Sequence, residues 1–273
     1  MQKAISSKIG VGLITCDRSE FLKKSYKSLK DNHNISFVVV DDGEISVKGL
    51  IENDKVHYIK TKGKEGVAVA KNKALKYLKE CGCEHIFLME DDIEVADNSV
   101  FEAYINTSKA TGIKHFNFGL HGNHNIDFNG NPTIRKTVNY GHTEIDLYPN
   151  VLGAFSYYHI DVLNNCGLMD ESFYNALEHV DHTYQIIKKG YHPPFRWFAD
   201  IKGSKNYLKD IVPDHQQSKI RNESNFQENF KKALDVFIFK NNFSVINGYG
   251  PSEKNYTEKE VVESLKEIYK NHV

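Results

Sequence analysis

Three consecutive carboxylates, Glu90-Asp91-Asp92, follow an apolar run that extends from His85 to Met89. A buried strand that ends in three acids concentrates negative charge, which repels itself unless a cation lies nearby. A divalent metal ion bound there would neutralise the acids and bridge to phosphate oxygens. The start of a helix would also account for the acids, because the helix dipole favours them there. The triplet therefore indicates a metal site or an acidic helix start.

A second acidic pair, Asp41-Asp42, ends the apolar run from Ile35 to Val40. Carboxylates at the carboxyl end of a strand can accept hydrogen bonds from a uracil N–H or from ribose hydroxyls. With the glycine that follows, the pair is also a common turn sequence. It therefore indicates either a nucleoside contact or a local turn.

Both acidic clusters end predicted strands that alternate with predicted helices. Apolar runs predict strands at 9–15, 35–40, 57–60 and 85–89, and helical spacing of apolar residues predicts helices at about 19–30 and 66–80. This alternation is typical of a mostly parallel α/β sheet, whose ligands gather beyond the carboxyl ends of its strands. Further helices are expected near 160–166, 179–189 and 257–271. Between 101 and 149 the periodicity fades, which predicts short strands and loops around an acceptor site.

The bulk composition narrows the class of protein. The 273 residues carry 35 Lys and Arg against 36 Asp and Glu, and the lysines are scattered, which argues against nucleic acid as a partner. The four cysteines lack the spacing of a structural zinc site and are interpreted as reduced thiols. No apolar run reaches the ~18 residues of a membrane span. We expect a cytoplasmic protein, with peripheral contact with the inner face of a membrane left open.

Taken in order, several segments resemble one known family. VGLITCDR, FVVVDDG, GVAVAKNKAL and IFLMEDDIEV are similar to the first-strand, uridine-contacting, donor-binding and DXD segments of family 2 inverting glycosyltransferases. GAFSYYHIDVLNNCGLMDESFYNALEHVDHTYQIIKKGY resembles the acceptor-side segment of that family. The resemblance covers about residues 8 to 192 and implies the GT-A fold, in which helices flank a mostly parallel central sheet.

The resemblance also implies roles for individual residues. The expected donor-binding residues are Thr15, Asp17, Arg18, Asp41, Asp42, Lys71, Glu90 and Asp91. Lys71 stands where the family usually has Arg and cannot form the planar fork of Arg. Asp92, the last acid of the triplet, would bind Mn²⁺ or Mg²⁺. His215 in a downstream polar loop would be a second ligand, with a solvated surface histidine as the alternative.

The acceptor hydroxyl must lose a proton during transfer, so the resemblance implies one positioned base. The family usually has Glu-Asp at the position of Glu178-His179 in this chain. His179 therefore departs from the pattern and leaves three candidates, of which Asp181 and Glu178 are ranked slightly above His179. A neutral imidazole or a carboxylate could each accept the proton.

Together these features predict a GT-A domain at 1–215, with a nucleotide-binding half at about 1–98 and an acceptor half at about 99–215. A mainly helical extension is expected at 216–273. The expected activity is inverting transfer of a sugar from a UDP-sugar to a glycan acceptor, in surface polysaccharide biosynthesis. The alternatives are a sugar nucleotidyltransferase and a nucleotide- or glycan-binding module without activity.

Overall fold

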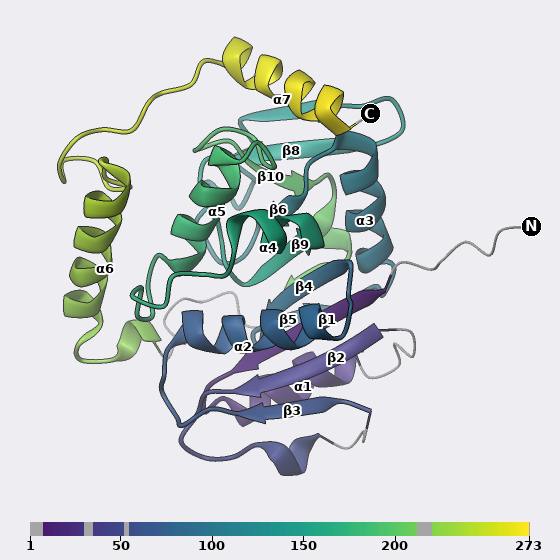
Figure 1. Cartoon of the computed structure of the whole chain (residues 1–273), viewed down its shortest axis with the longest axis vertical. Helices are drawn as coiled ribbons and strands as arrows, with labels where there is room; N and C mark the ends of the chain where they lie inside the picture. The colour runs from purple at the N-terminus through teal and green to yellow at the C-terminus, as the bar shows by residue number, and fades with distance from the viewer. Residues whose placement is uncertain (1–7, 30–34, 52–54, 212–219, 273) are drawn as a thin grey trace, which may run out of the picture.

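The computed structural model describes residues 8–29, 35–51, 55–211 and 220–272 (Figure 1). The elements up to the acid triplet are β1 (Ile9–Thr15), α1 (Ser19–Leu29), β2 (Ile35–Asp41), β3 (His57–Lys60), α2 (Val67–Glu80) and β4 (His85–Glu90). Next come β5 (Ile93–Val95), α3 (Val100–Thr111), β6 (His115–Asn117), β7 (Lys136–Asn139), β8 (Glu144–Tyr148), β9 (Phe155–His159), α4 (Ile160–Cys166) and α5 (Glu178–Lys188). The last are β10 (Phe198–Ile201), β11 (Leu208–Asp210), α6 (Phe226–Asn241) and α7 (Glu258–His272).

Six strands form the central sheet in the order β3-β2-β1-β4-β9-β6. The first four are parallel, whereas β9 runs antiparallel to β4 and to β6. The predicted mostly parallel α/β sheet is therefore confirmed. Thr15 lies opposite Asp41, and Ile14 lies opposite Glu90. The register thus brings the polar ends of β1, β2 and β4 to one edge of the sheet.

Helix α2 packs unusually close to β1 because β1 has glycine at Gly10 and Gly12. A Cβ atom added at Gly12 would lie 2.7 Å from the Cβ of Ala74, and one at Gly10 would lie 2.9 Å from Leu78. Small residues on both elements therefore set the spacing between the helix and the sheet. This packing holds the start of α2 near the carboxyl end of β1.

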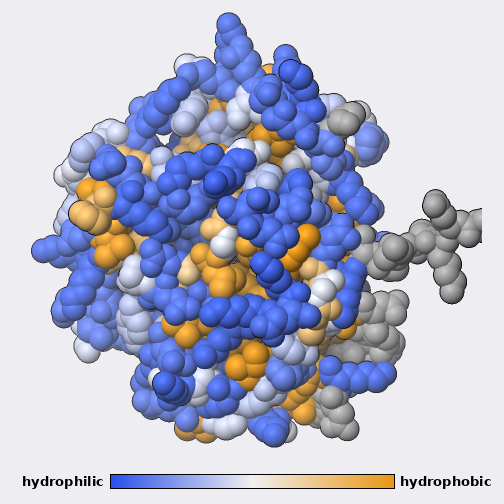
Figure 2. Space-filling view, viewed as in Figure 1, coloured by the Kyte–Doolittle hydropathy of each residue, from blue (hydrophilic) through white to orange (hydrophobic). Residues whose placement is uncertain are grey.

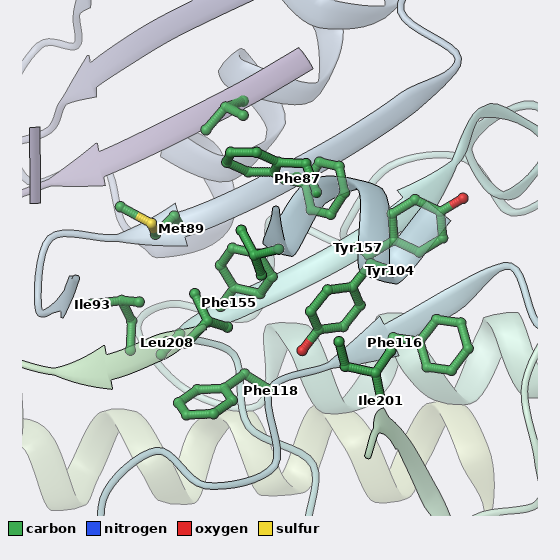
Figure 3. Packing of buried hydrophobic residues seen from close by; sticks show 14 of the residues in the cluster. Phe87, Met89, Ile93, Tyr104, Phe116, Phe118, Phe155, Tyr157, Ile201 and Leu208 are labelled. Atoms are coloured by element: carbon green, nitrogen blue, oxygen red, sulfur yellow. The ribbon is translucent and has the colours of Figure 1, made fainter. Parts of the chain in front are cut away.

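Helices cover both faces of the sheet. On one face α2, α4 and α5 pack over alternate strand residues such as Val38 and Leu88. On the other face α1, α3 and α7 enclose a larger core, whose aromatic centre includes Phe87, Tyr104 and Phe155 (Figure 3). The two cores leave the carboxyl ends of the parallel strands uncovered, which is where a ligand site is expected in such a sheet.

The segment 101–149 differs from its predicted description, because it begins with a 12-residue helix, α3. The buried face of α3 includes Thr107, Ser108 and Thr111, whose polar side chains hide the apolar period in the sequence. The remainder of the segment does form short strands. They belong to a three-stranded sheet of order β10-β8-β7, and β11 pairs with β5 beside the central sheet.

The C-terminal part is mainly helical. Helix α6 packs through Leu234 and Phe237, and α7 packs on the core through Val261 and Leu265. Thr257 and Glu260 form reciprocal hydrogen bonds that cap the start of α7. In Figure 1 the chain between α6 and α7 runs around the outside of the molecule.

The surface seen in Figure 2 is largely hydrophilic, with small separate apolar patches, one of them at the left edge, where α6 lies. The outward-facing Phe239 of α6 is 90% exposed. Throughout the part of the chain that the structure describes, every helix is too short or too polar to cross a lipid bilayer.

Candidate active site

A cavity of about 490 Å³ lies at the carboxyl ends of β1 and β4. Its polar end is lined by residues that follow the parallel strands, and its apolar end by residues from the loop before β9, from α5 and from α6. The polar lining includes Thr15, Arg18, Asp42, Glu90, Asp91, Asp92, His121, Glu178 and His179. The cavity therefore brings two of the predicted base candidates to the acid triplet, although at least 86 residues separate them in the sequence.

Arg18 organises the acid triplet. Its guanidinium donates to Asp92 Oδ2 at 3.1 Å and forms an ion pair with Asp91. The Thr15 hydroxyl also donates to Asp91, at 2.5 Å. Burial raises the pKa of Asp91 to about 7, although the charge of Arg18 and the hydrogen bond from Thr15 act in the opposite direction. Asp91 is thus held by the protein, and its neighbours satisfy both of its oxygens.

One carboxylate oxygen of Asp92 accepts no hydrogen bond from the described residues. Its side chain is 15% exposed, and its Oδ1 atom is buried without a hydrogen-bond partner among the described residues. A buried carboxylate oxygen that lacks a donor is costly unless a ligand satisfies it. A hard divalent cation prefers such an oxygen, so Asp92 fits the predicted metal. The described residues contain no group of three or more His, Cys, Asp or Glu side chains that could hold an ion.

The second acidic pair has divided roles. Asp41 is fully buried and accepts from the amides of Gly43 and Val47 and from the Tyr58 hydroxyl. It therefore holds the turn after β2 and does not line the cavity. Asp42 does line it, while its oxygens accept from the amides at the start of α2.

Asp17 lies near this turn with a positive φ of 51°. Its Oδ1 accepts from the amides of Glu44 and Ile45, at 2.7 and 3.2 Å. Asp17 thus joins the end of β1 to the loop after β2. It is not among the residues that line the cavity, so its contacts here are with the protein backbone.

Lys71 on α2 is 1% exposed and links the two halves of the site. Its Nζ lies 2.7 Å from Glu90 and 3.1 Å from Glu178, and it donates to the Gly153 carbonyl at 3.1 Å. Burial alone would lower the pKa of this lysine, but the two carboxylates outweigh burial and raise it. Lys71 therefore stays charged and positions both acids. It is not among the residues that line the cavity, where contact with a nucleotide sugar was expected.

The three base candidates on α5 differ in what they face. Asp181 is 1% exposed and accepts from Lys240 at 2.7 Å and from Asn241 at 3.0 Å. It therefore faces α6 and does not line the cavity. His179, with a side chain 23% exposed, lines the cavity, and its Nδ1 lies 3.1 Å from Glu178.

Glu178 is already engaged as an ion-pair partner. Burial alone would raise its pKa, but the charge of Lys71 and the contact with His179 outweigh burial and hold the pKa well below its ordinary value. A carboxylate with a depressed pKa is a weak base. Glu178 is instead suited to orient the imidazole of His179.

The structure adds a polar pair that sequence reasoning missed. His121 Nδ1 lies 2.7 Å from Asp210, whose other oxygen accepts from the Gly122 amide at 2.7 Å. Asp210 pairs with Ile93 across β5 and β11, which places it beside Asp92. The two partners are 89 residues apart, so no spacing in the sequence could reveal them. His215, the predicted second metal ligand, lies outside the described residues.

The comparisons with known proteins relate this fold to the GT-A fold of glycosyltransferases. Residues 11–122 match the family model described as "Glycosyl transferase family 2". That segment contains most of β1, the turn after β2 and the acid triplet, so the predicted family resemblance is confirmed over it. The N-terminal portion of the chain is thus similar to family 2 glycosyltransferases.

Solved structures with the same fold are glycosyltransferases of low sequence identity. TarS from S. aureus is 15% identical, with a TM-score of 0.53 over 96% of this chain and 48% of that one. TarS 1–349 in complex with UDP-GlcNAc is 15% identical, with a TM-score of 0.51 and coverages of 96% and 80%. GalNAc-T7 with UDP, GalNAc and Mn²⁺ is 14% identical, with a TM-score of 0.50 and coverages of 66% and 40%.

The chain spans about half the length of the TarS structure, 48% of it. No match was found among curated proteins.

Proposed function

We propose that this protein transfers a sugar from a UDP-sugar to an acceptor hydroxyl with inversion at the anomeric carbon, in a metal-dependent reaction. The observation that carries the proposal is that one cavity holds both the unpartnered Asp92 oxygen and the His179–Glu178 pair. Direct displacement requires a cation site for the leaving group and a base for the nucleophile, and this one cavity offers residues suited to both. A bound cation would stabilise the leaving diphosphate, and the base would deprotonate the nucleophile.

His179 is the proposed base. Its Nδ1 faces the Glu178 carboxylate, which favours the tautomer with a proton on Nδ1 and a free lone pair on Nε2. The acceptor oxygen then forms the new bond to the anomeric carbon while its proton passes to Nε2. The bond from that carbon to the diphosphate breaks, and its electron pair leaves with UDP. Asp181, ranked above His179 on the sequence, is the weaker candidate because Lys240 and Asn241 occupy its carboxylate.

Asp92 is the proposed metal ligand, and a bound Mn²⁺ or Mg²⁺ would neutralise charge on the leaving diphosphate. Its second oxygen stays with Arg18, which fixes the direction in which Oδ1 points. His121, oriented by Asp210, is a further candidate ligand from the same cavity wall. His215 remains a predicted ligand.

The donor is proposed to be a UDP-sugar, bound by the residues that line the polar end of the cavity. Thr15 and Asp42 would contact the nucleoside, while Arg18 and Glu90, which line the same cavity, would lie nearer the diphosphate. The structures of TarS with UDP-GlcNAc and of GalNAc-T7 with UDP share the fold and support this choice. Asp41, Asp17 and Lys71 would act indirectly, through the backbone and the acids that they hold.

The proposed pathway is surface polysaccharide biosynthesis with a glycan acceptor, as the family resemblance implies. The proposed domain limits remain 1–215 for catalysis, divided near 98, and 216–273 for the extension. The extension packs on the acceptor half through α6. A cytoplasmic site of action, with contact at the inner face of the membrane, belongs to the same proposal.

Calorimetric binding of UDP with and without Mn²⁺ tests the donor site, in the wild type and in Asp92→Asn. We expect Mn²⁺ to tighten UDP binding in the wild type only. Asp127→Asn is a matched control, because Asp127 lies in an exposed loop where the structure gives it only local contacts. If Mn²⁺ has no effect on UDP binding, and GDP and CMP also fail to bind, the transferase proposal is wrong.

Hydrolysis of the UDP-sugar in the presence of Mn²⁺ separates the remaining alternatives. Slow release of UDP together with free sugar supports a transferase. Metal-dependent UDP binding without any turnover would indicate a binding module. Formation of UDP-sugar from UTP and a sugar phosphate would instead identify a sugar nucleotidyltransferase.

A further inference from the structure

The proposed contacts with the nucleotide sugar do not use the apolar end of the cavity. We call it the apolar chamber and define it by its lining residues Val151, Leu152, Phe195, Phe198, Phe226 and Phe230. They come from three separate segments of the chain, one of which is formed by two successive turns of α6. A diphosphate and a sugar need donors and acceptors, and hydrocarbon walls supply neither.

The apolar chamber begins at the proposed base. Val151 and Leu152 directly precede Gly153, where an added Cβ atom would lie 2.9 Å from the His179 ring. The next residue of α5, Val180, also lines the cavity. The chamber therefore adjoins the part of the cavity that His179 lines, so a group attached to an acceptor at His179 can reach it.

Two polar side chains that line the cavity, Arg196 and Asn150, are already engaged. Arg196 donates through Nε to Glu253 at 2.5 Å and through a terminal nitrogen to the Val245 carbonyl at 2.5 Å. Asn150 donates to the His124 carbonyl at 2.8 Å. These groups hold loops together and leave little of their hydrogen-bonding capacity for the several hydroxyls of a sugar.

Contacts within the protein fix the shape of the apolar chamber before any ligand binds. Arg196 has a φ of 67°, a backbone region that costs energy for any residue other than glycine. Its bonds to Glu253 and Val245 hold this conformation and fix the loop that follows α6 against the chamber. On α6 itself, Phe226 and Phe230 are spaced i and i+4, so their rings form one continuous stripe along the helix.

We propose that the acceptor is a lipid-linked saccharide, whose hydrocarbon chain occupies the apolar chamber while its hydroxyl reaches His179. An extended chain suits a stripe along a helix, and each buried methylene strengthens binding about fourfold. This inference rests on the proposed function, because it assigns the acceptor of that same site. It narrows the predicted glycan acceptor to one that carries an apolar group close to the reacting sugar.

Binding of methyl, butyl and octyl β-D-glucosides tests the proposal, measured calorimetrically below the micelle concentration. The Kd should fall with chain length, by roughly 100-fold from methyl to octyl if about half of the seven added methylenes are buried. Phe230→Asp should abolish the dependence on chain length. Phe239→Asp is the matched control, because Phe239 lies on the same helix but is 90% exposed and does not line the chamber.

The proposal is overturned if the Kd is independent of chain length, or if the two Asp variants weaken octyl glucoside equally. Phe226→Ser gives a milder second variant should Phe230→Asp unfold, and it too should flatten the dependence on chain length. UDP titrations of the same samples keep the two proposals apart. Octyl glucoside binding without UDP binding overturns the donor site alone, whereas UDP binding without any effect of chain length overturns the lipid-linked acceptor alone.

Discussion

Lys71 Nζ lies 2.7 Å from Glu90 Oε1 and thereby ties the last residue of β4 to the start of α5 through Glu178. One buried ammonium thus serves two carboxylates that belong to different halves of the cavity. Replacing Lys71 with methionine keeps the volume but leaves both acids without their cation. We expect a loss of about 3–5 kcal/mol in the free energy of unfolding, measured by urea denaturation.

Lys73→Met is the matched control for that measurement. Lys73 lies on the same helix, but its side chain is 35% exposed and its pair with Glu65 spans 3.7 Å. A loss under about 1 kcal/mol is expected, because exposed ion pairs contribute little. Equal losses for the two variants would show that the buried ion pair has no special role.

The assignment of His179 as the base predicts opposite outcomes for substitutions of His179 and of Asp181, which both lie on α5. His179→Gln should lower kcat by about 10²–10⁴-fold while UDP binding stays unchanged. Asp181→Asn should lower stability, since Lys240 loses a charged partner, and should keep kcat close to the wild type. Steady-state kinetics with calorimetry of UDP decides between them, and the reverse pattern would restore Asp181 as the base.

The substitution Gly153→Ala adds one methyl group, which should displace the proposed base, His179, without changing the chemistry of the imidazole. An added Cβ atom would lie 2.9 Å from the His179 ring and 3.1 Å from Lys71 Nζ, so the imidazole must shift. We expect Gly153→Ala to lower kcat more than UDP affinity, because misplaced groups cost rate. Gly49→Ala is the control, since no atom lies within 4 Å of an added Cβ there. Full activity of Gly153→Ala would contradict the assignment of His179 as the base.

The pair of His121 and Asp210 predicts an effect on metal affinity. His121→Ala and Asp210→Asn should each weaken Mn²⁺ binding by about 10–100-fold, the usual cost of losing an oriented ligand or its partner. Electron paramagnetic resonance of free Mn²⁺ measures this without turnover. His142→Ala is a suitable control, because His142 does not line the active-site cavity. Unchanged affinity in both variants would exclude His121 as a ligand.

Buried histidines should make the fold sensitive to acid. Burial lowers the pKa of His182 and of His192 to about 4, from an ordinary value of 6.5. Between these two values the unfolded chain binds more protons than the folded one, so the free energy of unfolding falls as the pH falls through that range. Each group contributes up to about 3 kcal/mol to that loss.

Urea midpoints measured from neutral pH down to about pH 4 check this prediction. His182→Met should show a shallower dependence on pH than the wild type. The same slope in both proteins would mean that His182 does not titrate in this range.

Much of the fold follows from local patterns in the sequence. The apolar runs before Thr15, Asp41 and Glu90 specify strands, and their parallel order brings the three ends together. Helix α3 could not be predicted in this way, because Ser108 and Thr111 lie on its buried face. Their hydroxyls are satisfied inside, by the carbonyls of Ile113 and Thr107, so polar residues occupy core positions.

The site is predictable only in part, for a related reason. The acid triplet and its loop are local, and the structure places them at the cavity. Whether Asp181 or His179 faces that cavity depends on where α6 packs, and Lys240 lies 59 residues further along the chain. Periodicity along one helix identifies its faces but not the partner that each face meets.

The pairing of β11 with β5 has a consequence for the order in which the site can be completed. The Ile211 amide donates to the Asp92 carbonyl at 2.7 Å, and Asp210 holds His121. During synthesis the acid triplet leaves the ribosome more than a hundred residues before these partners. A nascent chain can therefore form its parallel strands early, yet Asp92 and His121 gain these partners only after residue 211 has been made.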